Sequence, residues 1–213
     1  DHIHGLKYLD EKIDILNFYC VENEAIKKEL TDDFKHYCKL RDGEYHYYVY
    51  KNCERKWMNI SGDNRGSSGI NFLWPITSNK SYIDELGKAK RGESYNNISP
   101  ILTYSLSGGI TAMWMGDIEN YFMDKVKDEI DWIEVDVLFA PHHGRESGKV
   151  PSDVLEKINP KIVVIGEAPS EHLNYYNGYN TLTQNSTGNI TFKNEQSKTE
   201  IYVENSNYKY DKS

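Results

Sequence analysis

Short apolar runs rich in aromatic and β-branched residues recur along the chain, and polar or Gly/Pro clusters separate them. Runs of this length and composition are typical of β-strands. Ser107-Gly108-Gly109 joins two such runs and predicts a β-hairpin, and the last two runs predict a second hairpin. We predict strands over residues 13–20, 45–50, 70–74, 99–106, 110–115, 135–139, 161–165, 190–192 and 200–203.

Other segments place their apolar residues three or four positions apart, which favours helices. We predict helices over residues 22–40, 81–89, 118–130 and 152–158. Residues 51–69 and 181–185 are polar and predict loops, the first as an insertion over a functional site. Strands interleaved with helices, without a repeat or a convincing linker, indicate an α/β fold formed by a single domain, residues 1–213.

Gly116-Asp117 ends the apolar run 110–115, so a carboxylate is expected at the end of a buried strand. Such a group needs a partner, and a metal ion is one reading, because its two oxygens can bridge two cations. The other reading is an N-cap for the helix that is expected to begin at Ile118. The two readings are compatible.

His142-His143-Gly144 follows the apolar run 135–139. Imidazole is the commonest nitrogen ligand of zinc, and a glycine permits close approach of the backbone, so this pair is a candidate metal site. A surface loop with two histidines is the alternative. Arg145 is either a partner for an anionic substrate group or a solvated charge.

Asp1-His2 could both reach one cation from a loop at the start of the chain, and His2-x-His4 also reads as a histidine pair. His172 lies in a polar loop after the run 161–165 and is a candidate ligand, proton donor or substrate-positioning group, or a plain surface residue. His36 and His46 fall within a predicted helix and a predicted strand, so we interpret both as structural.

The composition changes this picture in two ways. The formal net charge of −8 argues against a protein that coats nucleic acid, but it permits a small anionic substrate held by metal ions. The three cysteines match no zinc or disulfide spacing and indicate free thiols in the cytoplasm. No apolar run is long enough to span a membrane, so we expect no membrane partner.

The order of these motifs resembles the metallo-β-lactamase superfamily, and more closely the branch of the DNA-uptake protein ComEC. That branch has an N-N-x-S-x-x-L segment before the strand that ends in G-D, an apolar strand into H-H-G, and then P-K and another apolar strand. The corresponding segments here begin at Asn96, Val137 and Pro160, and the resemblance is most specific from Asn96 onwards. It implies an αββα sandwich that is incomplete at the N-terminus.

The resemblance also implies roles for individual residues. The metal ligands would be Asp1, His2, Asp117 and His143, with His142 as a rival to His143. The chain begins inside a motif and lacks its H-x-H half, which we expect upstream of Asp1. Assistance in catalysis would come from His172, Tyr175 or Arg145, and Asn97 would stand where other members place a further histidine. We therefore group Asn97, Arg145 and Tyr175 as candidate substrate-binding residues, and Asp117 and His172 as candidate catalytic ones.

The implied function is a metal-dependent hydrolase, most directly a phosphodiesterase or nuclease that uses a metal-bound hydroxide. Zinc is the default ion for such a site, and manganese is the alternative. The partners would be a small anionic substrate or a nucleic-acid end, and a second copy or another protein. Two other functions stay open: hydrolysis of a lactone, amide or phosphorylated small molecule, and a degenerate module that binds without catalysis.

Overall fold

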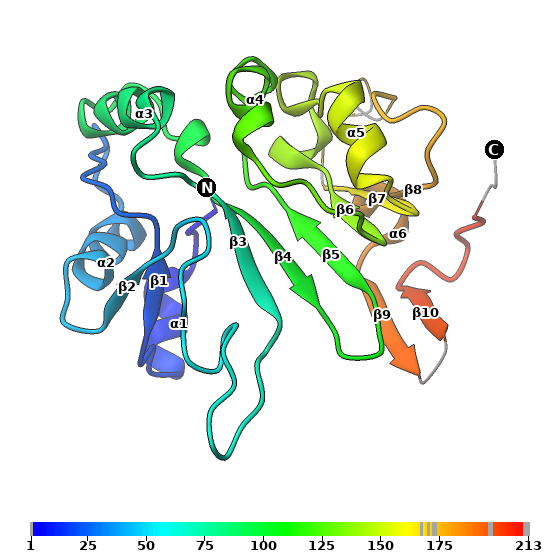
Figure 1. Ribbon diagram of the computed structural model, residues 1–213, viewed down its shortest axis with the longest axis horizontal. Coiled ribbons are helices and arrows are strands. Elements are labelled where there is room, and N and C mark those ends of the chain that lie inside the picture. Colours follow the sequence, from blue (N-terminus) through cyan, green and yellow to red (C-terminus); the bar gives the residue numbers. More distant parts are fainter. Residues whose placement is uncertain (1, 167, 170, 172–173, 196–197, 211–213) are drawn as a thin grey trace.

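A computed structural model describes residues 2–166, 168–169, 171, 174–195 and 198–210. Its centre is a six-stranded sheet with the strand order β3-β4-β5-β6-β7-β8 (Figure 1). The chain is therefore mixed α/β, as predicted. The six strands are β3 (Ile70–Trp74), β4 (Ile101–Ser105), β5 (Thr111–Trp114), β6 (Val137–Phe139), β7 (Ile162–Ile165) and β8 (Thr181–Thr183).

The sheet is antiparallel on one side and parallel on the other. The turn at Ser107-Gly108-Gly109 joins β4 and β5 as the predicted hairpin, and β3 also pairs with β4 in the antiparallel sense. From β5 to β8 all neighbours run parallel. The carboxyl ends of parallel strands meet at one edge of a sheet, so the residues that follow β5, β6 and β7 lie side by side there.

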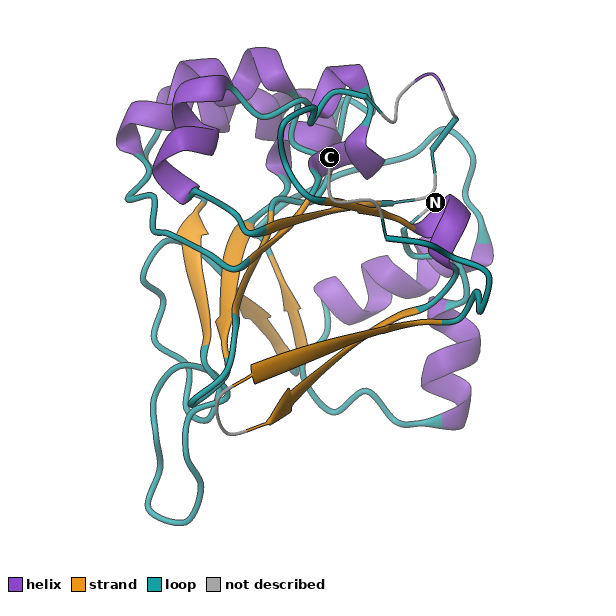
Figure 2. Cartoon of the chain, turned by 90° about the vertical axis from the view of Figure 1, so that its right-hand side faces the viewer, coloured by secondary structure: helices purple, strands orange, loops and turns teal. Residues whose placement is uncertain are grey.

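Helices cover one face of this sheet, and a second hairpin lies against the other (Figure 2). Phe122, Met123 and Val126 of one helix are completely buried in the main core, because the helix has a continuous apolar side. The covering helices are α3 (Lys80–Lys90), α4 (Asn120–Val126) and α5 (Ser152–Ile158). The second hairpin is formed by β9 (Ile190–Glu195) and β10 (Lys198–Val203).

The N-terminal region is smaller and lies beside the antiparallel half of the sheet (Figure 1). It has a parallel two-stranded sheet of its own, β1 with β2, and two helices that contact each other. Its elements are α1 (Leu6–Lys12), β1 (Phe18–Cys20), α2 (Asp32–Arg41) and β2 (His46–Tyr48). The remaining short elements of the chain are α6 (Gln184–Thr187) and the 3-10 turns η1 (Asn96–Ile98), η2 (Lys127–Glu129), η3 (Pro141–Gly144) and η4 (Glu146–Gly148).

Two predictions about the N-terminal region are wrong in extent. The helix predicted over 22–40 starts only at Asp32, because the hydroxyl of Thr31 accepts a hydrogen bond from the Phe34 N–H and caps the helix there. Of the strand predicted over 13–20, only Phe18–Cys20 is extended in a sheet. Ile13 and Leu16 are 68% and 72% exposed, so these apolar residues do not belong to a buried strand.

Two predicted loops also need correction. Residues 181–185 contain β8, in which two threonines flank the buried Leu182 and which completes the parallel sheet beside β7. The segment 51–69 does not cover the strand ends that carry Asp117. It returns to the sheet at Gly69, which contacts Ser105 at the far end of β4 (Figure 1). In the described parts of the chain, no helix combines the length and the apolar character needed to cross a membrane.

Candidate metal centre

Three side chains from distant parts of the chain meet at one point. His2 Nε2 lies 2.9 Å from Asp117 Oδ2 and 3.1 Å from His143 Nε2. Among the described residues, this is the only group of three or more His, Cys, Asp or Glu side chains whose ligand atoms all lie within 4.8 Å of one another. We call these three residues the His2–Asp117–His143 triad.

Asp117 reaches the triad through a sharp turn directly after β5. Gly116 has a positive φ of 55°, and a Cβ there would lie 2.6 Å from the Cβ of Ser99, so glycine is required. The Asp117 N–H donates to Ser99 Oγ at 3.1 Å. The N-cap reading of Asp117 is wrong, because α4 begins two residues later than expected and has Glu119 at its N-cap position.

His143 reaches the triad through a strained loop directly after β6. His142 and His143 both have left-handed backbone conformations, with φ values of 50° and 59°. Such conformations cost free energy for residues other than glycine and collect at functional sites. Gly144 and Gly166 allow the loop to pack closely, since a Cβ on either would crowd Ile165 or His143 itself.

The same loop separates the roles of the two histidines. The His143 ring faces His2 edge-on, with ring centroids 5.0 Å apart. His142 instead places Nδ1 3.0 Å from Ser147 Oγ, and it is not a member of the triad. The structure therefore favours His143 over His142 as the ligand.

Asp33 of α2 supports the turn that follows His2 in the sequence. Asp33 accepts hydrogen bonds from the backbone N–H groups of Gly5 and Lys7, both at 2.9 Å, and so fixes the first turn of α1. These hydrogen bonds lower the pKa of Asp33 below its ordinary value. His4 lies 3.6 Å from Asp33, and its side chain is 94% exposed. The His2-x-His4 reading is not supported, because His4 is outside the triad.

The triad is partly shielded from solvent. The side chain of Asp117 is 17% exposed, and that of His2 is 50% exposed. Burial lowers the pKa of His143, and Arg145 and the neighbouring histidines lower it further, while Asp117 opposes the shift. A lowered pKa keeps His143 neutral near pH 7, which is the protonation state that binds a metal ion.

The triad opens into a cavity of about 330 Å³ at the carboxyl edge of the sheet. The walls away from the triad include three aromatic rings. Trp114 and Phe139 stack with ring centroids 4.3 Å apart, and Phe192 of β9 meets Phe139 edge-on. The cavity therefore combines one polar corner with an apolar surface, as small-molecule sites commonly do.

Asn97 does not face this cavity. It is 1% exposed, and its amide nitrogen lies within hydrogen-bond distance of Glu85, Glu119 and Tyr121. Its carbonyl oxygen accepts from the Glu119 N–H at 2.9 Å. The structure therefore places Asn97, predicted as a substrate-binding residue, outside the cavity lining and with its hydrogen-bonding groups engaged by the protein.

The other candidates occupy different surroundings. Arg145 is exposed and close enough to lower the pKa of His143. The Tyr175 hydroxyl lies 3.4 Å from a carboxylate oxygen of Glu146. Asp1 and His172, predicted as a metal ligand and a catalytic residue, lie outside the described residues. His36 is structural, as predicted, because its Nε2 lies 2.7 Å from Asp10 Oδ2 and links α2 to the end of α1.

Sequence reasoning missed the residues that support the triad. Ser99 was noted only as part of N-N-x-S-x-x-L, and nothing in its local pattern shows that its hydroxyl meets the Asp117 N–H. Asp33 had a clearer signal, because Thr31-Asp32-Asp33 is a typical helix start. That pattern explains α2, but not the hydrogen bonds across to α1.

The donor set of the triad fits a divalent cation. Two imidazoles and one carboxylate, with a further position open, are a ligand set found in catalytic zinc sites. The ligand atoms of the triad all lie within 4.8 Å of one another, so one divalent cation could contact all three. No protein-family model matches this chain, and no curated protein sequence matches it.

Proposed function

We propose that this protein is a metal-dependent hydrolase of the metallo-β-lactamase fold that cleaves a phosphodiester. The observation that carries the proposal is the His2–Asp117–His143 triad, whose ligand atoms converge from residues 141 positions apart in the sequence. The ions we propose are Zn²⁺ first and Mn²⁺ second, because the set is mixed imidazole and carboxylate.

The fold supports this proposal through the helix-free face of the central sheet. Ala112, Val137 and Val164 are buried on that face, next to the β9–β10 hairpin, and the neighbouring apolar side chains are only partly buried. In an αββα sandwich this face packs against a second sheet. Each half of such a sandwich has a sheet with helices on one face and apolar residues on the other, as the central sheet has here.

The chemistry assigned to the chain follows from its own groups. A bound divalent ion would supply a nucleophilic hydroxide near neutral pH and would polarise the electrophile. His143 is neutral and ready to bind, because its pKa is lowered. Asp117 brings a negative charge that attracts the cation.

The choice of substrate rests on charge. Arg145 is exposed and follows His143 by two residues, so its planar guanidinium would be a partner for an anionic group of the substrate. The surface as a whole is acidic, with a net charge of −8, which disfavours long nucleic acids. A small phosphodiester or a single nucleic-acid end therefore suits the site better than duplex DNA.

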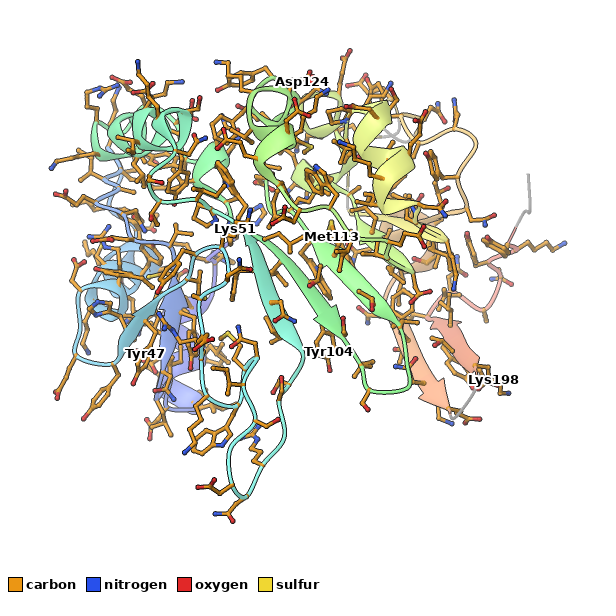
Figure 3. The ribbon with its side chains drawn as sticks, in the orientation of Figure 1. Tyr47, Lys51, Tyr104, Met113, Asp124 and Lys198 are labelled. Carbon is orange, nitrogen blue, oxygen red and sulfur yellow. The ribbon has the colours of Figure 1, made fainter. Side chains whose placement is uncertain are left out.

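The test combines metal binding with hydrolysis. Calorimetric titration with Zn²⁺ and Mn²⁺ should show one ion per chain, bound weakly because three described side chains hold it. Hydrolysis of bis(p-nitrophenyl) phosphate should depend on the added ion. Asp117→Asn should lose both properties. Asp124→Asn is the matched control, because Asp124 of α4 (Figure 3) pairs with Lys127 and belongs neither to the triad nor to the cavity lining.

Two results would exclude the proposal. The first is a wild-type chain that binds neither ion at millimolar concentration. The second is an Asp117→Asn variant that keeps full metal binding and full activity. Metal binding without any hydrolysis, lost in Asp117→Asn, would instead identify a metal-dependent module that is not an enzyme.

A further inference from the structure

We propose that Ser99 and Asn97 are positioning residues that hold the Asp117 loop in its ligand geometry. This inference rests on the proposed metal site and deepens it. Neither side chain belongs to the triad, and both lie in the segment just before β4. We call residues 96–99 the brace.

Ser99 holds the backbone of Asp117, the carboxylate ligand of the triad. Its hydroxyl accepts the Asp117 N–H at 3.1 Å, so the backbone of the ligand residue is tied to a side chain of a different segment. The contact with Gly116 is also tight, since a Cβ on Gly116 would meet Ser99 Cβ at 2.6 Å and Ser99 Oγ at 2.7 Å. Ser99 therefore restrains both residues of the Gly-Asp pair.

Asn97 fixes the next part of the same loop. Its carbonyl oxygen accepts the Glu119 N–H, two residues after Asp117. The amide cannot turn over, because its nitrogen side faces Glu85, Glu119 and Tyr121, of which the two carboxylates can only accept. Burial to 1% exposure removes competing water and makes this orientation rigid.

The brace also reaches the second ligand loop. The Gly116 carbonyl oxygen accepts the His142 N–H at 2.9 Å, so the turn that carries Asp117 supports the loop that carries His143. The Asp117 N–H thus donates to Ser99, and the His142 N–H donates to Gly116. Since metal affinity depends on how well ligands are held in place, loss of the brace should weaken binding without removing a ligand.

A serine elsewhere in the chain makes the same bond without this consequence. Ser67 Oγ accepts the Gly69 N–H at 3.0 Å, at the opposite end of the sheet from Asp117. Ser67→Ala therefore removes a hydroxyl acceptor from a loop, together with the hydrogen bond that Ser67 Oγ donates to the Met58 carbonyl oxygen, and serves as the control for Ser99→Ala. Ser99→Thr keeps the hydroxyl and serves as the rescue variant.

The experiment measures two quantities in the full chain. The first is hydrogen exchange of the Asp117 amide in metal-free protein, followed by NMR. The second is the affinity for Zn²⁺ and Mn²⁺, measured by calorimetry. We expect Ser99→Ala to speed exchange of the Asp117 amide and to weaken metal binding about tenfold. Ser67→Ala should change neither quantity, and Ser99→Thr should restore both towards the wild-type values.

The outcomes separate this inference from the proposed function. If Ser99→Ala leaves the exchange rate and the affinity unchanged, or if Ser67→Ala weakens the affinity equally, the brace has no positioning role. If the wild-type chain binds no metal, the proposed function fails, and the inference falls with it even where exchange shows that Ser99 orders the loop. If Ser99→Thr fails to fold, the inference is still tested by comparing Ser99→Ala with Ser67→Ala in amide exchange and in metal affinity.

Discussion

The sheet region, residues 70–183, and the N-terminal region, residues 2–50, are held together by different forces. In the sheet region, Met113 and Leu138 are completely buried beneath the helices. In the N-terminal region, α1 has no buried residue, and Tyr47 of β2 is 38% exposed (Figure 3). Hydrophobic burial therefore stabilises the first region far more than the second.

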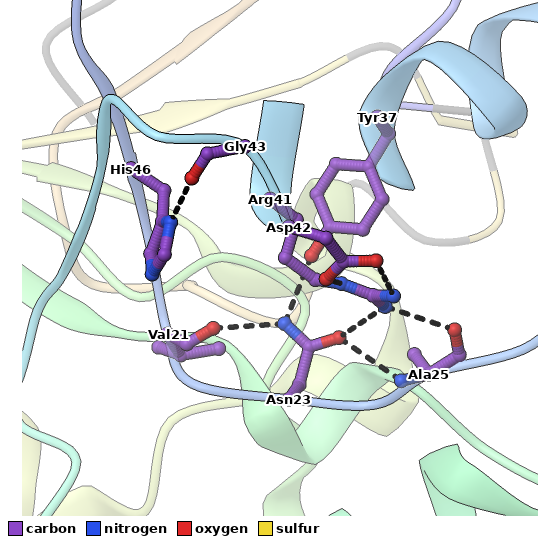
Figure 4. Close-up of polar contacts among 8 residues, drawn as sticks. All are labelled: Val21, Asn23, Ala25, Tyr37, Arg41, Asp42, Gly43 and His46. Atoms are coloured by element: carbon purple, nitrogen blue, oxygen red, sulfur yellow. Dashed lines mark hydrogen bonds and ion pairs between the residues drawn. The ribbon is translucent and has the colours of Figure 1, made fainter. Parts of the chain in front are cut away.

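Polar contacts add to a small set of buried apolar side chains in the N-terminal region, such as Phe34 and Val49. Arg41 is 8% exposed, and its guanidinium contacts Asp42, Asn23 and the Ala25 carbonyl oxygen (Figure 4). Asn23 adds hydrogen bonds to Tyr37 and to the Val21 carbonyl oxygen. Asp117 and His143 thus follow strands of the well-packed central sheet. His2 belongs to the N-terminal region, where hydrogen bonds contribute more of the stability.

The largest expected effect is a cavity in the sheet region. Leu138→Ala in β6 should lower the free energy of unfolding by about 3 kcal/mol, because the surrounding core cannot close around the lost methyl groups. Leu16→Ala removes the same atoms from a side chain that is 72% exposed, and should change stability by less than about 0.5 kcal/mol. Urea unfolding measures both, and equal losses in the two variants would contradict the contrast between the regions.

An intermediate effect is expected from the network around Arg41. Asn23→Ala leaves the Ala25 N–H and part of the Arg41 guanidinium without a partner, which should cost about 1–3 kcal/mol. The loss should be local, with faster hydrogen exchange in α2 and unchanged exchange in β5. Asn71→Ala, at an exposed position of β3, is the control. Equally accelerated exchange in α2 and β5 would show that the two regions unfold as one unit.

The sequence predicted the sheet region well, because strong apolar runs and glycine turns coincide there with real elements. The run 110–115, the turn at Gly108 and the helix 152–158 all lie where the pattern placed them. In the N-terminal region the same reasoning failed. Ile26 and Leu30 suggested a helical stripe, yet they are 54% and 57% exposed and precede the helix, since Thr31 caps it.

The triad was predictable in part for the same reason. Asp117 and His143 follow strands that the apolar pattern identifies, and parallel strands bring their carboxyl ends together. The choice of His143 over His142 depends on backbone conformation, and the burial of Asn97 depends on Glu85 and Tyr121. Neither is encoded in a local pattern, because each arises from contacts between segments far apart in the chain.

A smaller effect is expected where the two regions meet at the triad. Asp33→Ala removes the acceptor for the Gly5 and Lys7 N–H groups, so the turn before α1 should loosen and His2 should be held less well. Zn²⁺ affinity should fall several-fold while the unfolding of the sheet region is unchanged. Asp32→Ala is the control, because Asp32 contacts only lysine side chains in the described parts of the chain. An equal loss of affinity in both variants would show that charge, and not the hydrogen bonds to α1, is responsible.

The smallest expected effect is a pH dependence of the same contact. Hydrogen bonds from Lys7 and Gly5 lower the pKa of Asp33 below its ordinary value of 3.8, so the folded state favours the carboxylate. Its stabilisation is therefore complete above that value and is lost as the pH falls through the lower folded pKa. The NMR shifts of the Gly5 and Lys7 amides, followed into acid, should titrate below 3.8, and in Asp33→Asn they should not titrate there. A midpoint at or above the ordinary value would mean that these amides do not hold the carboxylate in solution, and the link between α2 and His2 would then need another explanation.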